Sequence, residues 1–449
     1  MTTSRRPTAP APDAPWGPRW TTDAGMTVLL EESHAIPLVD VEVVLKTGAL
    51  FDPPGKEGLG RLAARLLRMG TKRLKAEDVD EAIDSMGAAL SVDVAHSMVR
   101  IHASVIRRSL PDLLELLGQL VCAPALRGAD LGLVQRETIA DLLSQRDNDR
   151  WLASRGFRAH LFGEHPYARP TFGTADTITK VSRGDVADFL GAHVVGENIV
   201  LGVAGDVTEG ELRAMVDRAF AKVPRGRAPE VTLPVPVIAK GRRVLVVDKP
   251  ERTQTQIFLG TLGTRLADPV FYPLVLANTA FGGTFTSRLV NEVRSKRGWS
   301  YAASARLGAD RQREAWSLYT HPSAENAIDC IALELELIEK FVDEGISAPE
   351  LSNARDYLVK SHAFDRDTAA KRLEPRLDAE VQSMPAEFYT HFVTSVGAVT
   401  LPRANEAVRA RLSHEDLSIV LVATAAPLLD RLQRLPGVRE VSVLPFDSL

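Results

Sequence analysis

The sequence of 449 residues contains only two cysteines, Cys122 and Cys330, and they lie far apart along the chain. Two thiols are too few for a disulfide framework or a four-thiolate zinc site, so we expect isolated, buried thiols. The chain also lacks the run of about 18 apolar residues that a membrane-spanning helix needs. Its formal net charge is only −4, which excludes a large field for attracting nucleic acid or an anionic membrane.

The N-terminus has little of what an export signal requires. Arg5 and Arg6 form a twin-arginine pair, but Pro, Ala and Asp follow them instead of an apolar stretch. We therefore expect a cytoplasmic protein whose residues 1–20, rich in Pro and Ala, form a mobile tail. A periplasmic location stays open.

The composition is that of a globular protein, with 45% apolar and 25% charged residues. The chain is too long for one ordinary core, so we expect two domains of roughly 200 residues each. The second half repeats the pattern of the first at an offset of about 215 residues, as a duplicated domain would. In both halves a strand-like run precedes an Asp-Pro pair and a helical pattern, which begins near Leu59 in the first half and near Tyr272 in the second.

The later elements also occur twice. Each half has a pair of alternating strands, then long helical stretches at about Leu110–Phe162 and Asn326–Phe392, then an apolar strand and a closing helix. The segment Lys222–Arg243 is rich in Pro, Gly and basic residues and is typical of a linker. These patterns predict an α+β protein with two homologous domains, 21–221 and 244–449. We expect each to be a mostly antiparallel sheet covered by helices.

The segment Gly58–Thr71 reads GLGRLAARLLRMGT. It strongly resembles the segment of pitrilysin-type, insulinase-like zinc metallopeptidases (inverzincins) that carries H-x-x-E-H inside the frame GLxHxxEHxxxxGT. Four frame residues are in register, namely Gly58, Leu59, Gly70 and Thr71. The family's two histidines and its glutamate are missing, so the resemblance implies a degenerate zinc motif.

The residues at the motif positions are Arg61, Ala64 and Arg65. Two imidazoles at i and i+4 of a helix share a face and can bind one zinc ion, and the glutamate acts as general base for the bound water. Guanidinium groups have no lone pair for a metal, and alanine has no proton acceptor. The resemblance places the third ligand at Asp141 or Leu142, and one ligand does not make a site. We expect no metal in this chain.

Two other readings of these residues have less support. No two of the ten histidines are three or four residues apart, and the nearest pair, His160 and His165, matches a family loop that binds no metal, so we interpret both as structural. Gly58, Gly60 and Ala63 fit the dinucleotide pattern G-x-G-x-x-[GA]. That pattern requires its glycines directly after a strand, whereas FDPPGKE intervenes here and no βαβ unit follows.

The second half contains FGGTFTSRLVNEVRSKRGWSYAASA, Phe281–Ala305. This run resembles the signature of the same family's C-terminal half, in which a tyrosine follows an arginine by seven residues. The resemblance implies that Arg294 and Tyr301 form a substrate-binding pair. The other matching residues are Gly282, Gly283, Ser287, Arg288, Leu289, Glu292 and Gly298. Guanidinium and phenol donors aimed at a peptide carbonyl would hold the substrate and stabilise charge on its oxygen.

The remaining arginines near these motifs are expected to be structural. We expect Arg288 to form a salt bridge within the fold. Arg61, Arg65 and Arg68 recur at i, i+4 and i+7 of one helix, and we expect a solvated or ion-paired face rather than an anion site. The alternative for the pair is that neither residue binds substrate. Arg294 would then be a charge on a solvated helix, and Tyr301 a half-buried strand residue.

Some members of this family, such as mitochondrial processing peptidase and several bacterial heterodimers, divide the zinc motif and the Arg/Tyr pair between two chains. The resemblance implies that this chain is the non-zinc subunit of such a heterodimeric metallopeptidase. It would be inactive alone, would enclose a chamber with a homologous H-x-x-E-H partner that holds zinc, and would help to bind an extended peptide. The alternative is a catalytically inert pseudo-peptidase with a structural or peptide-binding role. An autonomous peptidase with relocated ligands has little support.

Overall fold

The computed structural model of the chain describes residues 16–385 and 387–449. Residues 1–15 of the expected mobile tail lie outside this description. The end of that tail is ordered, contrary to the expectation: strand β1 (Arg19–Thr21) pairs with strand β2 (Thr27–Glu32), and Trp20 is buried. Among the described residues, no helix is both long and apolar enough to cross a membrane.

The chain forms two compact units. The first comprises residues 1–142, 169–232 and 363–391, and the second comprises residues 143–168, 233–362 and 392–449. Each unit therefore contains a segment from the other half of the sequence. The sequence predicted two domains that are continuous in the chain, 21–221 and 244–449. The compact units are not continuous, so these bounds stay a prediction for the two duplicated halves of the sequence.

The first unit is built on a six-stranded sheet in the order β1-β2-β6-β3-β5-β4. Only β2 and β6 pair in parallel, and the other four pairings are antiparallel. The sheet is thus mostly antiparallel, as the sequence predicted. Its remaining strands are β3 (Leu38–Leu45), β4 (Ala89–Val94), β5 (Val99–Ile106) and β6 (Ile199–Gly205).

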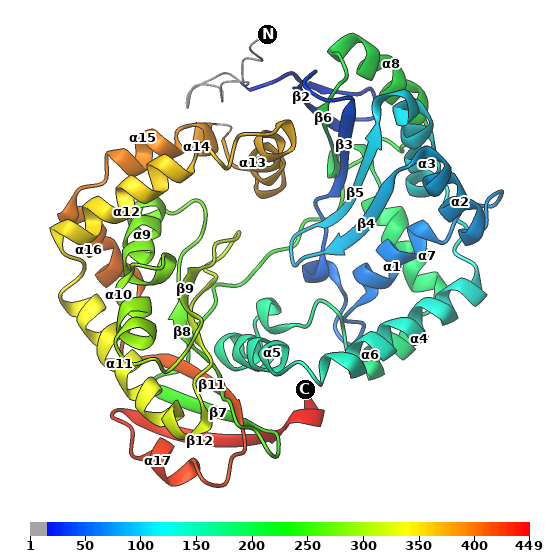
Figure 1. Ribbon diagram of the computed structural model, residues 1–449. Coiled ribbons are helices and arrows are strands. Elements are labelled where there is room, and N and C mark those ends of the chain that lie inside the picture. The colour runs from blue at the N-terminus through cyan, green and yellow to red at the C-terminus, as the bar shows by residue number, and fades with distance from the viewer. Residues whose placement is uncertain (1–15, 386) are drawn as a thin grey trace, which may run out of the picture. The chain divides into compact units, whose positions relative to one another are not determined.

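Helices cover both faces of this sheet (Figure 1). One face packs on a large apolar core shared with α1 (Leu59–Arg68), α3 (Leu110–Cys122) and α7 (Arg183–His193). On the other face, α13 (Ala369–Gln382) buries Leu373 and Leu377 against Leu29 and Val200. The other helices of this part are α2 (Ala76–Met86), α4 (Gly128–Gln145), α6 (Ala175–Lys180), α8 (Glu209–Ala219) and α14 (Glu387–Thr390).

The second unit repeats this plan with the strand order β12-β7-β11-β8-β10-β9. Here β7 is parallel to both β11 and β12, and the other three pairings are antiparallel. The strands are β7 (Arg242–Asp248), β8 (Gln256–Leu262), β9 (Ala303–Leu307), β10 (Ala315–Thr320), β11 (Leu417–Ala423) and β12 (Val438–Pro445).

Helix α5 (Asp149–Phe162), from the first half of the sequence, packs on the β11–β8 region of this second sheet, where Phe157 and Phe258 lie with their ring centroids 5.9 Å apart. The core on the other face is formed with α9 (Phe271–Asn278), α11 (Ala327–Asp343) and α16 (Leu401–Arg411). The remaining helices are α10 (Arg288–Val290), α12 (Ala348–Ser361), α15 (Phe392–Gly397) and α17 (Leu429–Gln433).

The two sheets confirm the internal duplication. Strand β2 begins at Thr27 and β7 at Arg242, 215 positions later, and the five strands that follow the same order in both sheets keep the same pairing directions. Strands β6 and β11 are buried at every residue because helices lie on both faces of each sheet. The edge strands β1 and β12 were not predicted, and they differ, since β1 pairs antiparallel and β12 parallel.

The expected linker, residues 222–243, contains no helix or strand until β7 begins at Arg242. The chain passes from the first unit to the second within it, between Thr232 and Leu233.

Candidate functional site

The degenerate zinc motif lies on helix α1, whose start is fixed by a buried carboxylate. The two oxygens of Asp52 accept hydrogen bonds from the backbone N–H groups of Gly58 and Gly60, both at 2.8 Å. Gly58 has φ +94°, and a Cβ there would lie 2.6 Å from the side chain of Ile178. The glycines of the dinucleotide-like pattern therefore serve the start of the helix and its close packing, which gives the nucleotide interpretation no support.

Arg65 joins α1 to α4 through a set of polar contacts. Its guanidinium donates to Glu137 at 2.8 Å, to the Thr138 hydroxyl at 2.8 Å and to Asp141 at 3.2 Å. Of the two sequence alternatives for the third ligand position, Asp141 therefore faces α1, whereas the side chain of Leu142 is buried. A permanent cation occupies the space in front of these carboxylates, so their charge is already neutralised.

Arg61 has a different environment, although it is one turn away on the same face. Its guanidinium lies over the ring of Phe172, with 3.5 Å between the guanidinium carbon and the ring centroid. The Nε atom is buried without a hydrogen-bond partner among the described residues. Burial, and secondarily the charge of Arg65, lowers the pKa of Arg61. Ala64, at the glutamate position, is buried and contributes only packing.

The three arginines of the stripe line a cleft of about 400 Å³ together with three carboxylates, those of Asp80, Glu137 and Asp141. Arg68 pairs with Asp80 at 2.9 Å. The expected ion-paired face is confirmed for Arg65 and Arg68, while Arg61 stacks on an aromatic ring instead. No group of three or more His, Cys, Asp or Glu side chains suitable for a metal occurs in the described part of the chain.

The histidines singled out by their spacing have structural contacts. His160 Nδ1 lies 2.7 Å from the Ser418 hydroxyl, and burial lowers the pKa of His160 to about 4. His165 is buried, and its Nε2 lies 3.0 Å from the carbonyl oxygen of Pro234. Both cysteines are unbridged, Cys330 buried and Cys122 half-buried, and burial raises the pKa of both thiols.

Arg294 and Tyr301 lie together in the second unit. The Arg294 guanidinium carbon is 4.5 Å from the centroid of the Tyr301 ring and 5.2 Å from that of Phe285. The two rings are 77% and 78% exposed, respectively. The Arg294 guanidinium forms no hydrogen bond or ion pair with another described residue. The result is an unpaired cation held between two exposed aromatic rings.

The backbone that presents this cluster is unusual. Arg294 lies in a π-helical turn, Asn291–Ser295, and a second π-helical turn, Thr279–Gly283, precedes it. Such turns are rare and occur frequently at functional sites. Gly282 is required by packing, because a Cβ there would lie 2.5 Å from the Cβ of Ala305 in the neighbouring strand β9.

The charged neighbours of Arg294 are paired elsewhere. Glu292 accepts hydrogen bonds from Lys296 at 2.6 Å and Arg297 at 2.7 Å, so it does not neutralise Arg294. Arg288 donates to both carboxylate oxygens of Glu350, at 2.9 and 2.8 Å, and to the carbonyl of Gly345. The predicted structural role of Arg288 is confirmed.

The sequence interpretation missed Phe285. Its position in FGGTFTSRL, between the glycine turn and the matched SRL, offered a signal: an aromatic residue amid small and polar residues that have no apolar periodicity to bury it. The exposure of the ring and its contact with Arg294 could be seen only in three dimensions.

Comparison with known proteins agrees with these features. Residues 27–175 match the family model described as Insulinase (Peptidase family M16), and residues 180–358 match the one described as Peptidase M16 inactive domain. A non-peptidase homologue, YmxG, of Helicobacter pylori is 22% identical over 89% of this chain and 92% of its own length. An uncharacterised zinc protease of Mycobacterium tuberculosis is 26% identical over 93% of this chain and 95% of its own length.

Solved structures show the same fold. A peptidase M16 inactive domain from Pseudomonas fluorescens superimposes with a TM-score of 0.83 at 22% identity, covering 90% of this chain and 97% of that one. A protease from Helicobacter pylori gives a TM-score of 0.80 at 17% identity, and the match covers 90% of this chain and 99% of that one. The matched regions span most of both halves, and the chain therefore belongs to the insulinase, or peptidase M16, family, as a member with Arg61, Ala64 and Arg65 in place of the zinc-motif residues.

Proposed function

We propose that this chain is the non-zinc subunit of a heterodimeric metallopeptidase and lends Arg294 and Tyr301 to the zinc centre of a homologous H-x-x-E-H partner. The observation that carries the proposal is the state of Arg294. A guanidinium with no carboxylate partner, held between the exposed rings of Phe285 and Tyr301, is ready to donate to a carbonyl oxygen of a bound peptide.

The state of α1 supports the other part of the proposal, that this chain contributes no zinc of its own. The Arg65 guanidinium already donates hydrogen bonds to the carboxylates of Glu137 and Asp141, and Arg61 adds a second permanent cation on the same face. A divalent ion would meet two positive charges and no imidazole. Zinc in the functional complex would come from the partner.

The second candidate function is that of an inert pseudo-peptidase with a structural or peptide-binding role. The relative named as a non-peptidase homologue favours it, since that chain is similar over nearly its whole length. The two candidates differ in one respect. In the first, Arg294 and Tyr301 act during turnover, and in the second they are dispensable for it.

The deciding experiment uses the homologous chain with an intact H-x-x-E-H motif, copurified with this protein from its source and then prepared separately. We expect this protein alone to contain far less than one zinc per chain by atomic absorption and to show no chelator-sensitive cleavage of a quenched fluorescent peptide. Mixing the two chains should restore cleavage. In the complex, Arg294→Ala should lower kcat about a hundred- to a thousandfold, because one directed donor to the developing charge is lost.

Matched controls exist in the same unit. Arg409 is an exposed arginine on α16, and Tyr357 is a 51% exposed tyrosine on α12. Arg409→Ala and Tyr357→Phe should leave turnover unchanged, whereas Tyr301→Phe should reduce it. Assembly measured by size-exclusion chromatography should be the same for all variants. Full turnover with both Arg294→Ala and Tyr301→Phe would refute the catalytic role and favour the inert subunit.

A further inference from the structure

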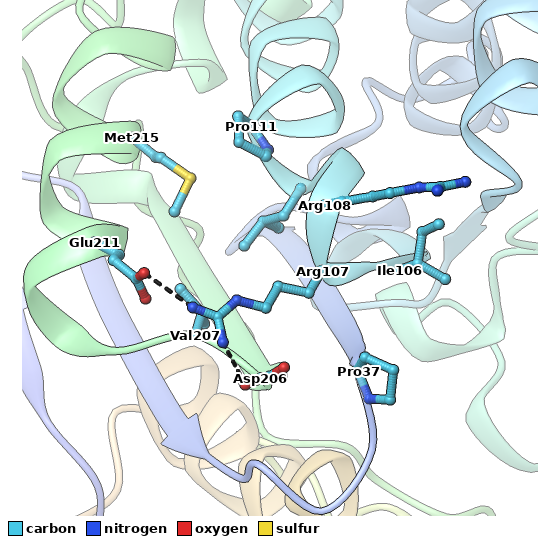
Figure 2. Close-up of a pocket in the computed structure, with 10 residues that line it drawn as sticks. Pro37, Ile106, Arg107, Arg108, Pro111, Asp206, Val207, Glu211 and Met215 are labelled. Carbon is cyan, nitrogen blue, oxygen red and sulfur yellow. Dashed lines mark hydrogen bonds and ion pairs between the residues drawn. The ribbon is translucent and has the colours of Figure 1, made fainter.

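A cleft of about 570 Å³ lies in the first unit and includes no residue of the two motifs described above. It is formed where strands β3, β5 and β6 meet the start of α3 and the side of α8 (Figure 2). Its apolar lining consists of Pro37, Ile106, Leu110, Pro111, Val207 and Met215. The neighbouring side chains Ile36 and Leu38 are exposed as well. This lining is aliphatic throughout and contains no aromatic ring, so it suits hydrocarbon rather than a stacked ring system.

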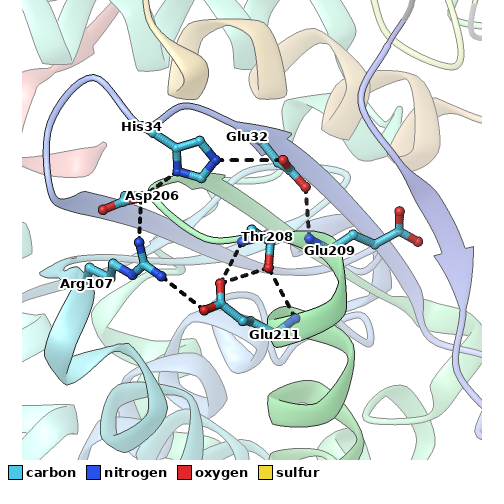
Figure 3. A network of polar contacts seen from close by, with 7 residues as sticks. All are labelled: Glu32, His34, Arg107, Asp206, Thr208, Glu209 and Glu211. Carbon is cyan, nitrogen blue, oxygen red and sulfur yellow. Dashed lines mark hydrogen bonds and ion pairs between the residues drawn. The ribbon is translucent and has the colours of Figure 1, made fainter.

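Most polar groups in the cleft bind one another. Arg107 donates to Asp206 and to Glu211, both at 3.0 Å. Figure 3 shows that both acids have further partners: His34 Nδ1 lies 2.6 Å from Asp206, and Thr208 caps α8 together with Glu211. These contacts hold the pKa values of Asp206 and Glu211 below their ordinary range. The network is therefore closed and offers little to the amide groups of a peptide.

Arg108 is the exception. It extends in the opposite direction from Arg107 (Figure 2), is exposed, and forms no hydrogen bond or ion pair with another described residue. It is the one charged side chain of the lining without a counter-charge in the described part of the chain. An occupant that is apolar over most of its length and carries one negative group would satisfy both features of the cleft.

The duplicated fold provides an internal comparison. The second unit has a cavity at the equivalent place, after the ends of β10 and β11, but its volume is about 280 Å³. Arg252, Glu325 and Arg431 line it, and Arg431 pairs with Asp329 at 2.9 Å. The fold thus leaves a space at this point in both halves. Charged and apolar side chains line the space in both units, and the space in the first unit is about twice as large.

We propose that the cleft of the first unit binds a medium-chain aliphatic carboxylate, with the hydrocarbon chain along Val207, Leu110 and Met215 and the carboxylate at Arg108. A peptide is disfavoured because its amide groups would lose water without gaining partners in a lining whose polar groups already bind one another. The site is independent of the proposed assistance to a zinc centre, since it shares no residue with it.

The test uses decanoate as the probe and the full chain with ¹³C-methyl-labelled methionine. Met215 lines the cleft, and its methyl signal is assigned from Met215→Leu. We expect a saturable shift of this signal on adding decanoate below its micellar concentration, and weaker binding of decan-1-ol, which lacks the charge. Arg108→Gln should weaken decanoate binding about threefold or more, since it removes one partly exposed ion pair.

The matched control is Arg73→Gln, which removes an exposed arginine from the same unit outside the cleft. It should leave decanoate affinity unchanged. Met215→Glu, which places a carboxylate in the cleft, should abolish binding while the other methionine signals stay in place as a check of folding. An unmoved Met215 signal, an equal loss with Arg73→Gln and Arg108→Gln, or tighter binding of an acetylated aliphatic tripeptide than of decanoate would each overturn the proposal.

Discussion

Single residues decide whether the family's chemistry is present in this chain. Arg61 and Arg65 stand at the positions of the two imidazoles, and the structure gives them different partners, an aromatic ring for Arg61 and carboxylates for Arg65. Neither group can give an electron pair to a metal. Arg294 differs from Arg65 in that its guanidinium N–H donors have no partner among the described residues, so they remain available to a ligand.

The first prediction at this scale concerns Phe285 as a positioning residue. If the proposed complex with a zinc-bearing partner forms, Phe285→Ala should lower its turnover about two- to fivefold, because Arg294 loses one of its two ring contacts. Phe285→Tyr should retain turnover, since it keeps the ring. In the Arg294→Ala background the same truncation should have no further effect, as expected for residues that act through one another. Equal losses in both backgrounds would contradict the positioning role.

The second prediction concerns pH and the buried Glu334 on α11. Its carboxylate accepts a hydrogen bond from Thr320 at 2.8 Å, and burial raises its pKa from 4.5 to about 7. The folded protein therefore binds this proton more tightly than the unfolded chain does. The resulting stability is present below pH 4.5 and is lost as pH rises toward 7.

Glu334→Gln should remove this pH dependence. In thermal unfolding, the Tm of the variant minus that of the unchanged protein should increase as the pH is raised from 5 to 8. The exposed Glu336 on the same helix provides the control, and Glu336→Gln should show no such trend. A constant difference for Glu334→Gln across this range would show that Glu334 does not titrate there.

At the scale of elements, α1 depends on the Asp52 carboxylate for its start. Asp52→Ala would leave the N–H groups of Gly58 and Gly60 without their acceptor in a buried place. We expect a loss of about 2 kcal/mol or more in the free energy of unfolding, measured with urea. Asp52→Asn, which retains one acceptor oxygen, should lose less. Equal stability of the alanine and asparagine variants would mean that these bonds do not support the helix.

At the scale of the whole molecule, each unit is completed by a helix from the other half of the sequence. Helix α13 covers Leu29, Val44 and Val200 in the first unit, and its Arg376 donates to Glu31 at 2.7 Å. Neither half of the chain thus contains every element of one unit. We therefore expect the first unit to be completed only after α13 has been synthesised.

This arrangement predicts the behaviour of a fragment. Residues 1–232, with residues 143–168 of the second unit replaced by a flexible linker, should bind a hydrophobic dye and aggregate, because the α13 face of their sheet is uncovered. The same fragment joined through a second flexible linker to residues 363–391 should be soluble and should unfold cooperatively in calorimetry. A stable, non-binding fragment without residues 363–391 would show that α13 is not needed to complete the unit.

Local patterns predicted most of the fold. Alternating apolar residues located the strand pairs, and the repeat at 215 positions predicted two related sheets, which the strand orders confirm. The edge strands escaped notice because β1 has three residues and the exposed β12 lacks a clear alternation. The placement of α5 and α13 also escaped notice, because a helix's own sequence shows that it has an apolar face but not which sheet that face will cover.

The sequence by itself determined that this chain is a member of a peptidase family without the zinc-motif side chains, because that conclusion depends on residue types at fixed spacings along one helix. Only the tertiary structure decided which groups are paired and which are available. Arg65 and Arg294 are both arginines within helical segments, yet one is neutralised by carboxylates of α4 and the other stands beside two exposed rings. The reason is that electrostatic and packing energies depend on distances between residues remote in the chain, which spacing along the sequence does not contain.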